Sequence, residues 1–512
     1  MASSDVATDS DSFVPEPFVR RGTFQDPSWN ERNLLSLDGG GVRGYWSLLV
    51  LEKLMEAIGE EEHRQALEAD EDVHNLHSFL PSELPPNVTQ CPRPPRDQQP
   101  SKAFYAQRFL PCHYFDLLCG SSTGSLIAIM LCRFRMTVQD CLQEYEKMSH
   151  SIFGNPRWIS QRNVFIVPWP KYSAKAMERA FKEVTDRRGE RLDLERDASP
   201  LPTFKTKPGV CSMFATTFRR TKSKEVNVKT LYLLRSYIHP EKKNLRRKPW
   251  RINFTSEGDM EIWKIARAAT AAPFYFSELK IKSDSKGKVY YSDGGFGQTN
   301  NPTLEGIREL ETLHRRLEGD NVISGSIGVI VSIGTARADD KPGGTSIFKR
   351  AKEAFGRATN PQHVAEAVNY DDRRNCWRFN DEQGLKIELD DWKPSNSSRP
   401  GHKSIALMRA GFNEWLLSGD NIDTIKACAR ELVIRRRQRT LNAAKWERFA
   451  TVAEFHCPSS DCHNTAIETR DDFIEHFDSK HARQPHEHSY GVPEITTWRY
   501  PSVSTSRSST VI

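Results

Sequence analysis

The pentapeptide Gly-Ser-Ser-Thr-Gly at residues 120–124 lies between two apolar runs. Residues 115–119 precede it and residues 125–131 follow it, an order that predicts a strand, a tight turn and a helix. In that context a G-x-S-x-G sequence forms a nucleophile elbow, in which the glycines leave room around an exposed serine. Ser122 would then stand at a helix N-terminus, where amide groups favour the negative charge of an oxyanion. Taken alone, the same residues also fit a surface turn.

A second glycine cluster lies upstream, between a predicted buried strand at residues 33–37 and a predicted amphipathic helix at residues 45–58. Its sequence is Asp38-Gly39-Gly40-Gly41-Val42-Arg43-Gly44. Three consecutive glycines leave backbone N–H groups uncovered, so the loop can cradle an oxyanion or a phosphate. The spacing also fits a dinucleotide fingerprint, which requires an acid near the tip of the next strand, about 20 residues on. Glu60–Glu62 instead end the helix and enter a polar loop, so we favour the oxyanion interpretation.

A third segment, residues 289–293, is predicted to be a strand that ends in an acid, Asp293. Gly294 and Gly295 follow, and a helix is predicted to begin near Thr303. An acid at a strand tip beside glycines can approach another group closely. By itself the segment also fits an ordinary Asp-Gly turn.

These three segments, in this order, resemble the patatin-like phospholipases over about residues 30–340. Residues 266–276 and 332–335 support the resemblance. It implies a lipid acyl hydrolase, of the phospholipase A or lysophospholipase kind, that works through a Ser–Asp dyad and an acyl-enzyme intermediate. It also implies an α/β fold of the patatin type, in which three α/β/α layers surround a mostly parallel central sheet.

The resemblance assigns roles to individual residues. Ser122 is the nucleophile, Asp293 is the base, and the oxyanion hole is formed by the amides of Gly39, Gly40 and Gly41. Supporting positions of the same motifs are Asp38, Arg43, Gly44, Gly120, Gly124, Gly294 and Gly295. No cofactor is implied for catalysis, and the expected partner is a lipid substrate at a membrane surface.

A dyad faces a chemical difficulty, because an aspartate in water has a pKa near ~3.9 and is a weak base for a serine hydroxyl. Burial of Asp293 would raise its pKa and make it a better base. The alternative is a Ser–His–Asp triad in the chain order serine, acid, histidine. His363 and His402 follow Asp293, but neither lies in a loop expected at a strand tip.

The pattern along the chain predicts several regions. Strand-like runs at residues 210–218, 230–235 and 327–333 alternate with helical patterns, which favours an α/β layer fold. The predicted regions are a disordered N-terminus at 1–28, a catalytic domain at 30–340 with a proline-rich insertion at 60–103, a mixed and helical extension at 341–450, a zinc-finger-like segment at 453–484 and a disordered tail at 485–512.

The zinc-finger-like segment contains Cys457, Cys462, His476 and His481, with four, thirteen and four residues between successive members. This resembles a two-Cys, two-His zinc finger, although the middle spacing is one residue longer than the usual twelve or so. Thiolate and imidazole ligands suit tetrahedral zinc. Such a segment predicts a protein or nucleic-acid contact or a structural role. The alternatives are a disordered tail and, for the whole chain, an interaction protein with a vestigial hydrolase domain.

Composition agrees with an intracellular protein. The ten cysteines suggest no disulfide framework, the N-terminus has no signal-peptide pattern, and no run approaches the ~20 apolar residues needed to span a bilayer. We therefore expect a cytoplasmic protein that associates peripherally with membranes, an association that the net charge of +6 permits. The basic run at Arg435–Arg437 and Arg439 is expected to be a solvated helix end, or else a nucleic-acid-binding patch or a localisation signal that would direct the protein to the nucleus.

Overall fold

The computed structural model describes residues 27–82, 107–154, 170–189, 202–221, 229–239, 253, 259–283, 287–295, 299–318, 327–336, 368, 375–393, 401–453, 455–457, 462, 466–467 and 469–481. Several predicted features lie outside these residues. They are residues 1–26 of the N-terminal segment, residues 83–103 of the insertion, His363 and the C-terminal tail at 485–512.

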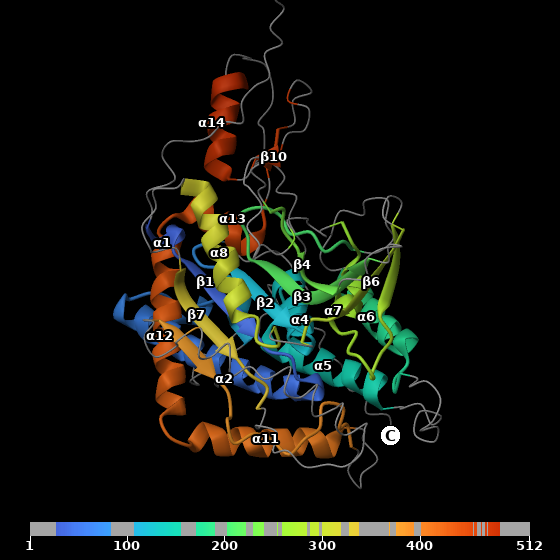
Figure 1. The fold of residues 1–512 in the computed structure, drawn as a ribbon. Helices are drawn as coiled ribbons and strands as arrows, with labels where there is room; N and C mark the ends of the chain where they lie inside the picture. The colour runs from blue at the N-terminus through green and yellow to red at the C-terminus, as the bar shows by residue number, and fades with distance from the viewer. Residues whose placement is uncertain are drawn as a thin grey trace, which may run out of the picture.

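An eight-stranded sheet forms the centre of the molecule (Figure 1). Its strands are β1 (Arg32–Leu37), β2 (Leu117–Ser121), β3 (Ser212–Thr221), β4 (Lys229–Arg235), β5 (Leu279–Ser283), β6 (Gly287–Asp293), β7 (Ile327–Ile333) and β8 (Cys376–Phe379). The strand order is β5-β6-β3-β2-β1-β7-β8, with β4 paired to β3. Strands β3, β2, β1, β7 and β8 run parallel, whereas β4, β5 and β6 add antiparallel pairs on one side. The predicted α/β class with a mostly parallel sheet is confirmed.

The chain also contains helices, most of which pack around this sheet. They are α1 (Pro27–Asn30), α2 (Gly44–Glu68), α4 (Thr123–Ala128), α5 (Val138–Phe153), α6 (Ala174–Gly189), α7 (Ile262–Ala269), α8 (Thr303–Glu318), α11 (His402–Leu417), α12 (Asn421–Thr440), α13 (Ala443–Thr451) and α14 (Arg470–His481). Two very short strands, β9 (Phe455–His456) and β10 (Ala466–Ile467), form a separate hairpin before α14.

Both faces of the sheet are buried, and neighbouring strand residues point to opposite faces. In β1, Leu34 belongs to the apolar cluster that contains Ile307 and Leu310 of α8. Leu35, the next residue, belongs to the larger cluster that contains the apolar residues of α2. The nearly continuous apolar sequence of the strands follows from this burial, which is typical of parallel sheets.

Helix α2 is longer than the sequence pattern predicts. The expected helix ends at Ile58 and the acids after it enter a polar loop, whereas the observed helix continues to Glu68. The prediction was wrong because Glu62 is fully buried and its charge is compensated by residues far along the chain. The expected surface insertion therefore begins with about two turns of packed helix.

The helical pattern predicted after residue 405 is confirmed by α11, α12 and α13. Helix α12 packs along α2 through an apolar face, and its predicted members Ile425, Ala429, Leu432 and Val433 are all buried. Strand β8 and helices α11 and α12 are thus packed as part of the sheet domain.

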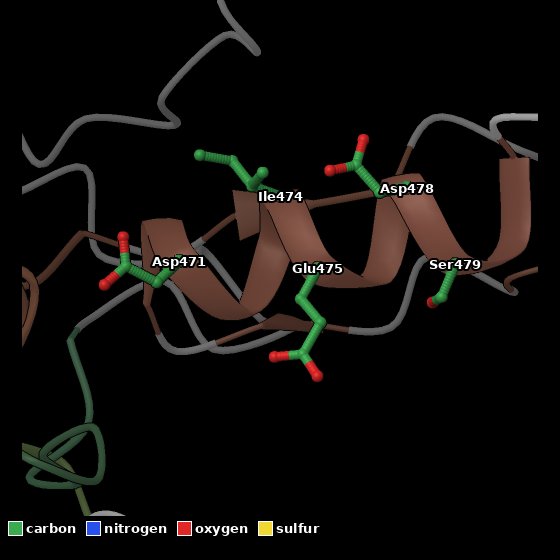
Figure 2. A pocket seen from close by; sticks show the side chains of 5 residues that line it. All are labelled: Asp471, Ile474, Glu475, Asp478 and Ser479. Atoms are coloured by element: carbon green, nitrogen blue, oxygen red, sulfur yellow. The ribbon is translucent and has the colours of Figure 1, made fainter.

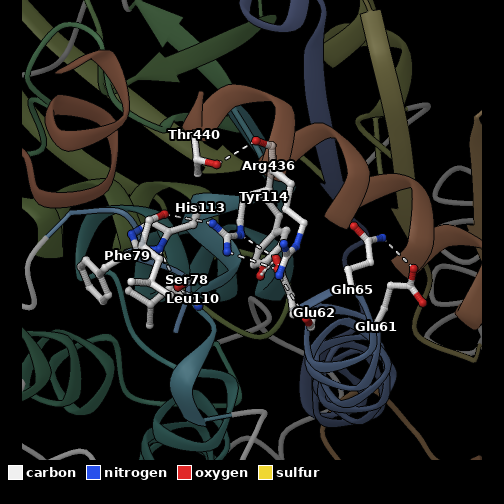
Figure 3. A network of polar contacts seen from close by, with 12 residues as sticks. Glu61, Glu62, Gln65, Ser78, Phe79, Leu110, His113, Tyr114, Arg436 and Thr440 are labelled. Atoms are coloured by element: carbon white, nitrogen blue, oxygen red, sulfur yellow. Dashed lines mark hydrogen bonds and ion pairs between the residues drawn. The ribbon is translucent and has the colours of Figure 1, made fainter. Parts of the chain in front are cut away.

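The arginines of α12 are not a solvated helix end. Arg436 and Arg437 both bind the buried carboxylate of Glu62, and Tyr114 donates a hydrogen bond to the same group (Figure 3). Arg439 is buried and binds Asp116. The expectation of a solvated run was wrong for these residues, and arginines held in this way cannot be presented as an extended localisation signal.

Candidate active site

Strand β3 brings Ser122 and Asp293 together. Its residue Thr216 pairs with Ser121 at the end of β2, and the next residue, Thr217, pairs with Asp293 at the end of β6. Strand β4 covers the opposite edge of β3 along the same residues. Strands β2 and β6 therefore share one edge of β3 and meet with their carboxyl ends facing each other. This register places the predicted nucleophile beside the predicted base although 171 residues separate them.

The predicted elbow has the expected geometry. Ser122 follows the last residue of β2 and precedes α4, with φ +50°, a left-handed conformation that L-residues rarely adopt. Gly120 and Gly124 flank it. A Cβ on Gly124 would lie 2.2 Å from the carbonyl oxygen of Leu37, so only glycine lets the turn approach β1 this closely.

The side chain of Ser122 donates a hydrogen bond to Asp293, with 2.6 Å between Oγ and Oδ2. The second carboxylate oxygen accepts the N–H of Gly295 at 2.7 Å. Asp293 is only 2% exposed. Burial raises its pKa to about 6, against the opposing effects of the Ser122 hydroxyl, the Gly295 amide and the charge of Lys229. The carboxylate is therefore more basic than one in water but still ionised at neutral pH.

The glycine loop passes directly over the elbow, since a Cβ on Gly39 would lie 3.1 Å from the Cβ of Ser122. The amide of Gly39 donates to the carbonyl oxygen of Asn300 at 3.1 Å. This amide is therefore already used, which is a difference from the expectation that all three glycine amides would serve as oxyanion donors.

The amides of Gly40 and Gly41 differ from that of Gly39. The Gly40 amide shares a peptide plane with the carbonyl of Gly39, whose oxygen accepts a hydrogen bond from the Thr335 hydroxyl at 3.4 Å. The Gly41 amide shares a plane with the carbonyl of Gly40, whose oxygen accepts a hydrogen bond from the Arg43 amide at 3.1 Å. Within the described part of the chain, no acceptor is found for the N–H groups of Gly40 and Gly41. An oxyanion hole built from this loop would therefore use these two amides.

Other members of the predicted motifs brace these elements. Asp38 accepts two hydrogen bonds from Arg378 of β8, at 3.0 and 2.6 Å. Arg43 is buried in the short helical turn that precedes α2. Gly294 packs on Thr216 of β3, and Gly44 is the first residue of α2.

Several residues around the loop were not predicted as site residues. Thr335 lies in the stretch 332–335 that supports the family resemblance, so its position carried a signal, whereas Asn300 lies outside the stretches that carry the resemblance. No sequence signal marks the other three residues, Arg378, Leu389 and Tyr145. An arginine in a strand, an apolar loop residue and a tyrosine on an amphipathic helix are common in any α/β protein.

The histidines of the triad alternative do not reach the dyad in the described structure. His402 is exposed at the first turn of α11, and His363 lies outside the described residues. Neither Ser122 nor Asp293 contacts a histidine among the residues that are described.

Comparison with known proteins gives a match over part of the chain. Residues 102–307, which include Ser122 and Asp293, match the patatin-like phospholipase family model. The chain contains a patatin-like domain. The match begins after the glycine loop, which is separated from the elbow by the long helix α2 and the insertion.

Named relatives share the patatin-like domain at low identity. Human calcium-independent phospholipase A2-gamma is 24% identical over 342 residues, which cover 66% of this chain and 32% of that protein. Patatin-like protein 4 of Arabidopsis thaliana is 23% identical over 316 residues, 60% of this chain and 59% of that protein. Mouse 85/88 kDa calcium-independent phospholipase A2 is 29% identical over 145 residues, 27% and 16% of the two chains. The chain thus spans about a third of the length of the human relative.

The dinucleotide alternative does not fit the patatin-like domain. Its acid would have to lie at the tip of the strand that follows the glycine loop, but Glu60–Glu62 lie within α2 and Glu62 is buried in an ion pair. Among the residues that the structure describes, no such acid lies in position to bind a ribose beside the glycine loop.

Beyond the patatin-like domain, β9, β10 and α14 form a small unit at one end of the molecule (Figure 1). Phe455 and Phe473 pack together in its core. Ligand atoms of Cys457, Cys462 and His476 lie within 4.8 Å of one another. The backbone of His481 ends α14, and its side chain lies outside the described atoms.

Among the helices that the structure describes, none combines the length and apolar character that a membrane span requires.

Proposed function

We propose that this chain is a serine acyl hydrolase that cleaves carboxylic ester bonds of phospholipids or related glycerolipids. The observation that carries the proposal is the 2.6 Å contact between Ser122 Oγ and a buried carboxylate, directly below a glycine loop with two amides available. The names of the relatives, which include two calcium-independent phospholipases A2, support lipid as the substrate class. Catalysis by these groups needs no metal.

The geometry supports a two-step reaction. Asp293 accepts the proton of Ser122 while Oγ attacks the ester carbonyl carbon, and the amides of Gly40 and Gly41 stabilise the oxyanion that forms. When the tetrahedral intermediate collapses, the carbon–oxygen bond to the leaving alcohol breaks, and the alcohol takes the proton from Asp293. Water then attacks the acyl-enzyme by the same path, gives a proton to Asp293, and releases the fatty acid as Ser122 recovers its proton.

Labelling with a fluorophosphonate tests the nucleophile. The wild-type protein should be labelled at Ser122, and Ser122→Ala should lose the label while remaining folded. Hydrolysis of a lipid panel, followed by mass spectrometry, then identifies the ester that is cleaved. Labelling at another serine, or none in a folded wild-type protein, would reject the proposal.

The raised pKa of Asp293 predicts the pH dependence of the reaction. Only the ionised carboxylate can accept a proton, so kcat/KM should rise with pH, level off above a midpoint near 6, and fall progressively below it. Lys229 lowers this pKa through its positive charge. We therefore expect Lys229→Gln to move the midpoint upward and Lys229→Arg to leave it in place, in pH–rate profiles on a soluble ester.

We further propose that the C-terminal unit binds zinc. Cys462 Sγ and His476 Nε2 lie 3.4 Å apart, close to the roughly 3.5 Å that tetrahedral Zn–S and Zn–N bonds impose. Cys457 supplies a buried sulfur. His481, the last residue of α14, is the fourth member of the predicted ligand set.

Zinc analysis provides a direct test. The purified chain should contain one zinc per molecule, and Cys462→Ser should lose most of it. Cys376→Ser, which changes a cysteine in β8, should retain it. Replacement by Co²⁺ should give thiolate-to-metal absorption in the wild-type protein and in Cys376→Ser, but not in Cys462→Ser. A wild-type protein that elutes without bound metal and stays metal-free after zinc is added would contradict the proposal.

A nucleic-acid role for this unit is disfavoured by charge. The outward side of α14 carries Asp471, Glu475 and Asp478 around the partly exposed Ile474 (Figure 2). A helix that recognises nucleic-acid bases would have to bring these carboxylates close to the phosphate backbone, whose negative charge repels them. A structural role or a contact with another protein fits the helix better.

A further inference from the structure

The hydroxyl of Tyr145 on α5 lies between the glycine loop and the nucleophile elbow. It donates a hydrogen bond to the carbonyl oxygen of Gly41 at 2.6 Å, and it lies 2.5 Å from the hydroxyl of Thr123. Thr123 directly follows Ser122 and is the first residue of α4. We propose that Tyr145 is a positioning residue that fixes the oxyanion-binding loop relative to the nucleophile. This inference rests on the hydrolase function proposed above.

The direction of these hydrogen bonds follows from counting hydrogens. A phenol has one proton, and the Gly41 carbonyl can only accept, so Tyr145 must donate to Gly41. Thr123 then donates to the oxygen of Tyr145. Burial raises the pKa of Tyr145, so its hydroxyl keeps this proton over the whole working pH range. The result is a one-way relay from Thr123 through Tyr145 to Gly41.

The relay completes the fixation of the loop. The peptide plane between Gly41 and Val42 is held at both ends, since its carbonyl accepts from Tyr145 and its N–H donates to the carbonyl oxygen of Leu389 at 2.8 Å. The preceding plane is held through the carbonyl of Gly40. The carbonyl of Gly41 also accepts the N–H of Gly44, and Gly41 has φ +56°, so Tyr145 is the side-chain member of the contacts that hold this flexible residue. Tyr145 thereby restrains the backbone of Gly41 from its carbonyl side, while the peptide plane that carries the Gly41 amide is held by Arg43.

Gly44 gives independent evidence for the relay. A Cβ at this position would lie 2.5 Å from the hydroxyl oxygen of Tyr145 and 2.7 Å from that of Thr123. The backbone of Gly44 is ordinary right-handed helix, so conformation alone does not call for glycine there. The space that Gly44 leaves is the space that the two hydroxyls occupy.

Kinetic comparison of Tyr145→Phe with the wild-type protein tests the positioning role. Loss of an oxyanion donor typically costs ~10² to 10³ in rate, and a misaligned donor should cost part of that, so we expect kcat to fall by about 10- to 100-fold. KM for a soluble ester should change by less than about threefold, because ground-state binding does not use these amides. Affinity for a trifluoromethyl ketone, which forms a tetrahedral adduct with the serine, should fall in parallel with kcat.

Tyr114→Phe is the matched control. Tyr114 is also buried, and its hydroxyl donates to Glu62 at 3.0 Å, far from the loop. The Tyr114→Phe protein should lose thermal stability, but its kcat and its affinity for the inhibitor should not change. A purely structural role for Tyr145 would give the same pattern in Tyr145→Phe, and that result would overturn the inference.

Gly44→Ala provides a second route that depends on the same contact. Gly44→Ala should lower kcat in the wild-type background, and it should cost several-fold less in the double variant Thr123→Ala/Tyr145→Phe, where both clashing hydroxyls are absent. Equal losses in the two backgrounds would contradict the relay. A wild-type protein without esterase activity or fluorophosphonate labelling overturns the proposed function and this inference together, whereas an active wild type with an equally active Tyr145→Phe overturns the inference alone.

Discussion

Replacing Asp293 with asparagine is expected to lower kcat by a factor of about 10² to 10⁴, the range that general-base catalysis contributes. The asparagine can still occupy the site and accept the Gly295 amide through its oxygen, but it cannot take the proton of Ser122. Because burial already raises the pKa of Asp293, the folded state favours the neutral form of this group. Ionisation at neutral pH therefore costs stability, and Asp293→Asn should unfold at the same temperature as the wild type or higher.

Glu305→Gln is the matched control for this substitution. Glu305 is another buried carboxylate whose pKa is raised by burial, but it lies on α8. Its replacement should leave kcat close to that of the wild type. Steady-state kinetics on a soluble ester and thermal unfolding of both variants make the comparison. An Asp293→Asn protein that retains more than about a tenth of wild-type kcat would show that another group takes the proton.

The sequence predicts the elements of the site well because each is local. A motif of five to seven residues is enough to recognise glycines, an acid or a serine at the tip of a strand. Apolar runs of strand length predict the bounds of β1, β2, β6 and β7 within one or two residues. The contact between Ser122 and Asp293 is different in kind. It depends on β3 pairing with β2 and then with β6 along one edge, and no spacing in the sequence encodes that register.

The sequence fails where a polar residue is buried by a distant partner. Glu62 lies in a run of acids that predicts a polar loop, and the arginines of α12 look like a solvated run. Both features are explained by one contact across 374 residues. Arg378, 340 residues from Asp38, likewise has no local signal. Charged residues in pairs of this kind are indistinguishable from surface residues until the fold is known.

Glu62→Gln is expected to lower the free energy of unfolding by about 3–5 kcal/mol, the usual cost of removing one partner from a buried ion pair. Glu62 is fully buried, and its carboxylate accepts from Arg436 at 2.5 Å, Arg437 at 2.9 Å and Tyr114 at 3.0 Å. The neutral amide leaves the guanidinium of Arg436 buried without a compensating charge. Urea unfolding followed by tryptophan fluorescence should show the loss as a lower midpoint, because buried tryptophans such as Trp446 lie beside Arg436.

Glu68→Gln is the matched control, because it makes the same chemical change at a solvent-exposed position of the same helix. Glu68 is largely exposed and pairs with Arg64 one turn away, so the urea midpoint should stay within the error of the measurement.

A second comparison separates two contributions to the loss of stability: the lost attraction between Glu62 and Arg436, and the cost of leaving the Arg436 charge buried without a partner. Combining Glu62→Leu with Arg436→Met removes both buried charges and should recover part of the stability that Glu62→Leu alone loses. If Glu62→Gln and Glu68→Gln were equally stable, the pair between α2 and α12 would contribute nothing to the fold, and the extension would have to be held by its apolar face alone.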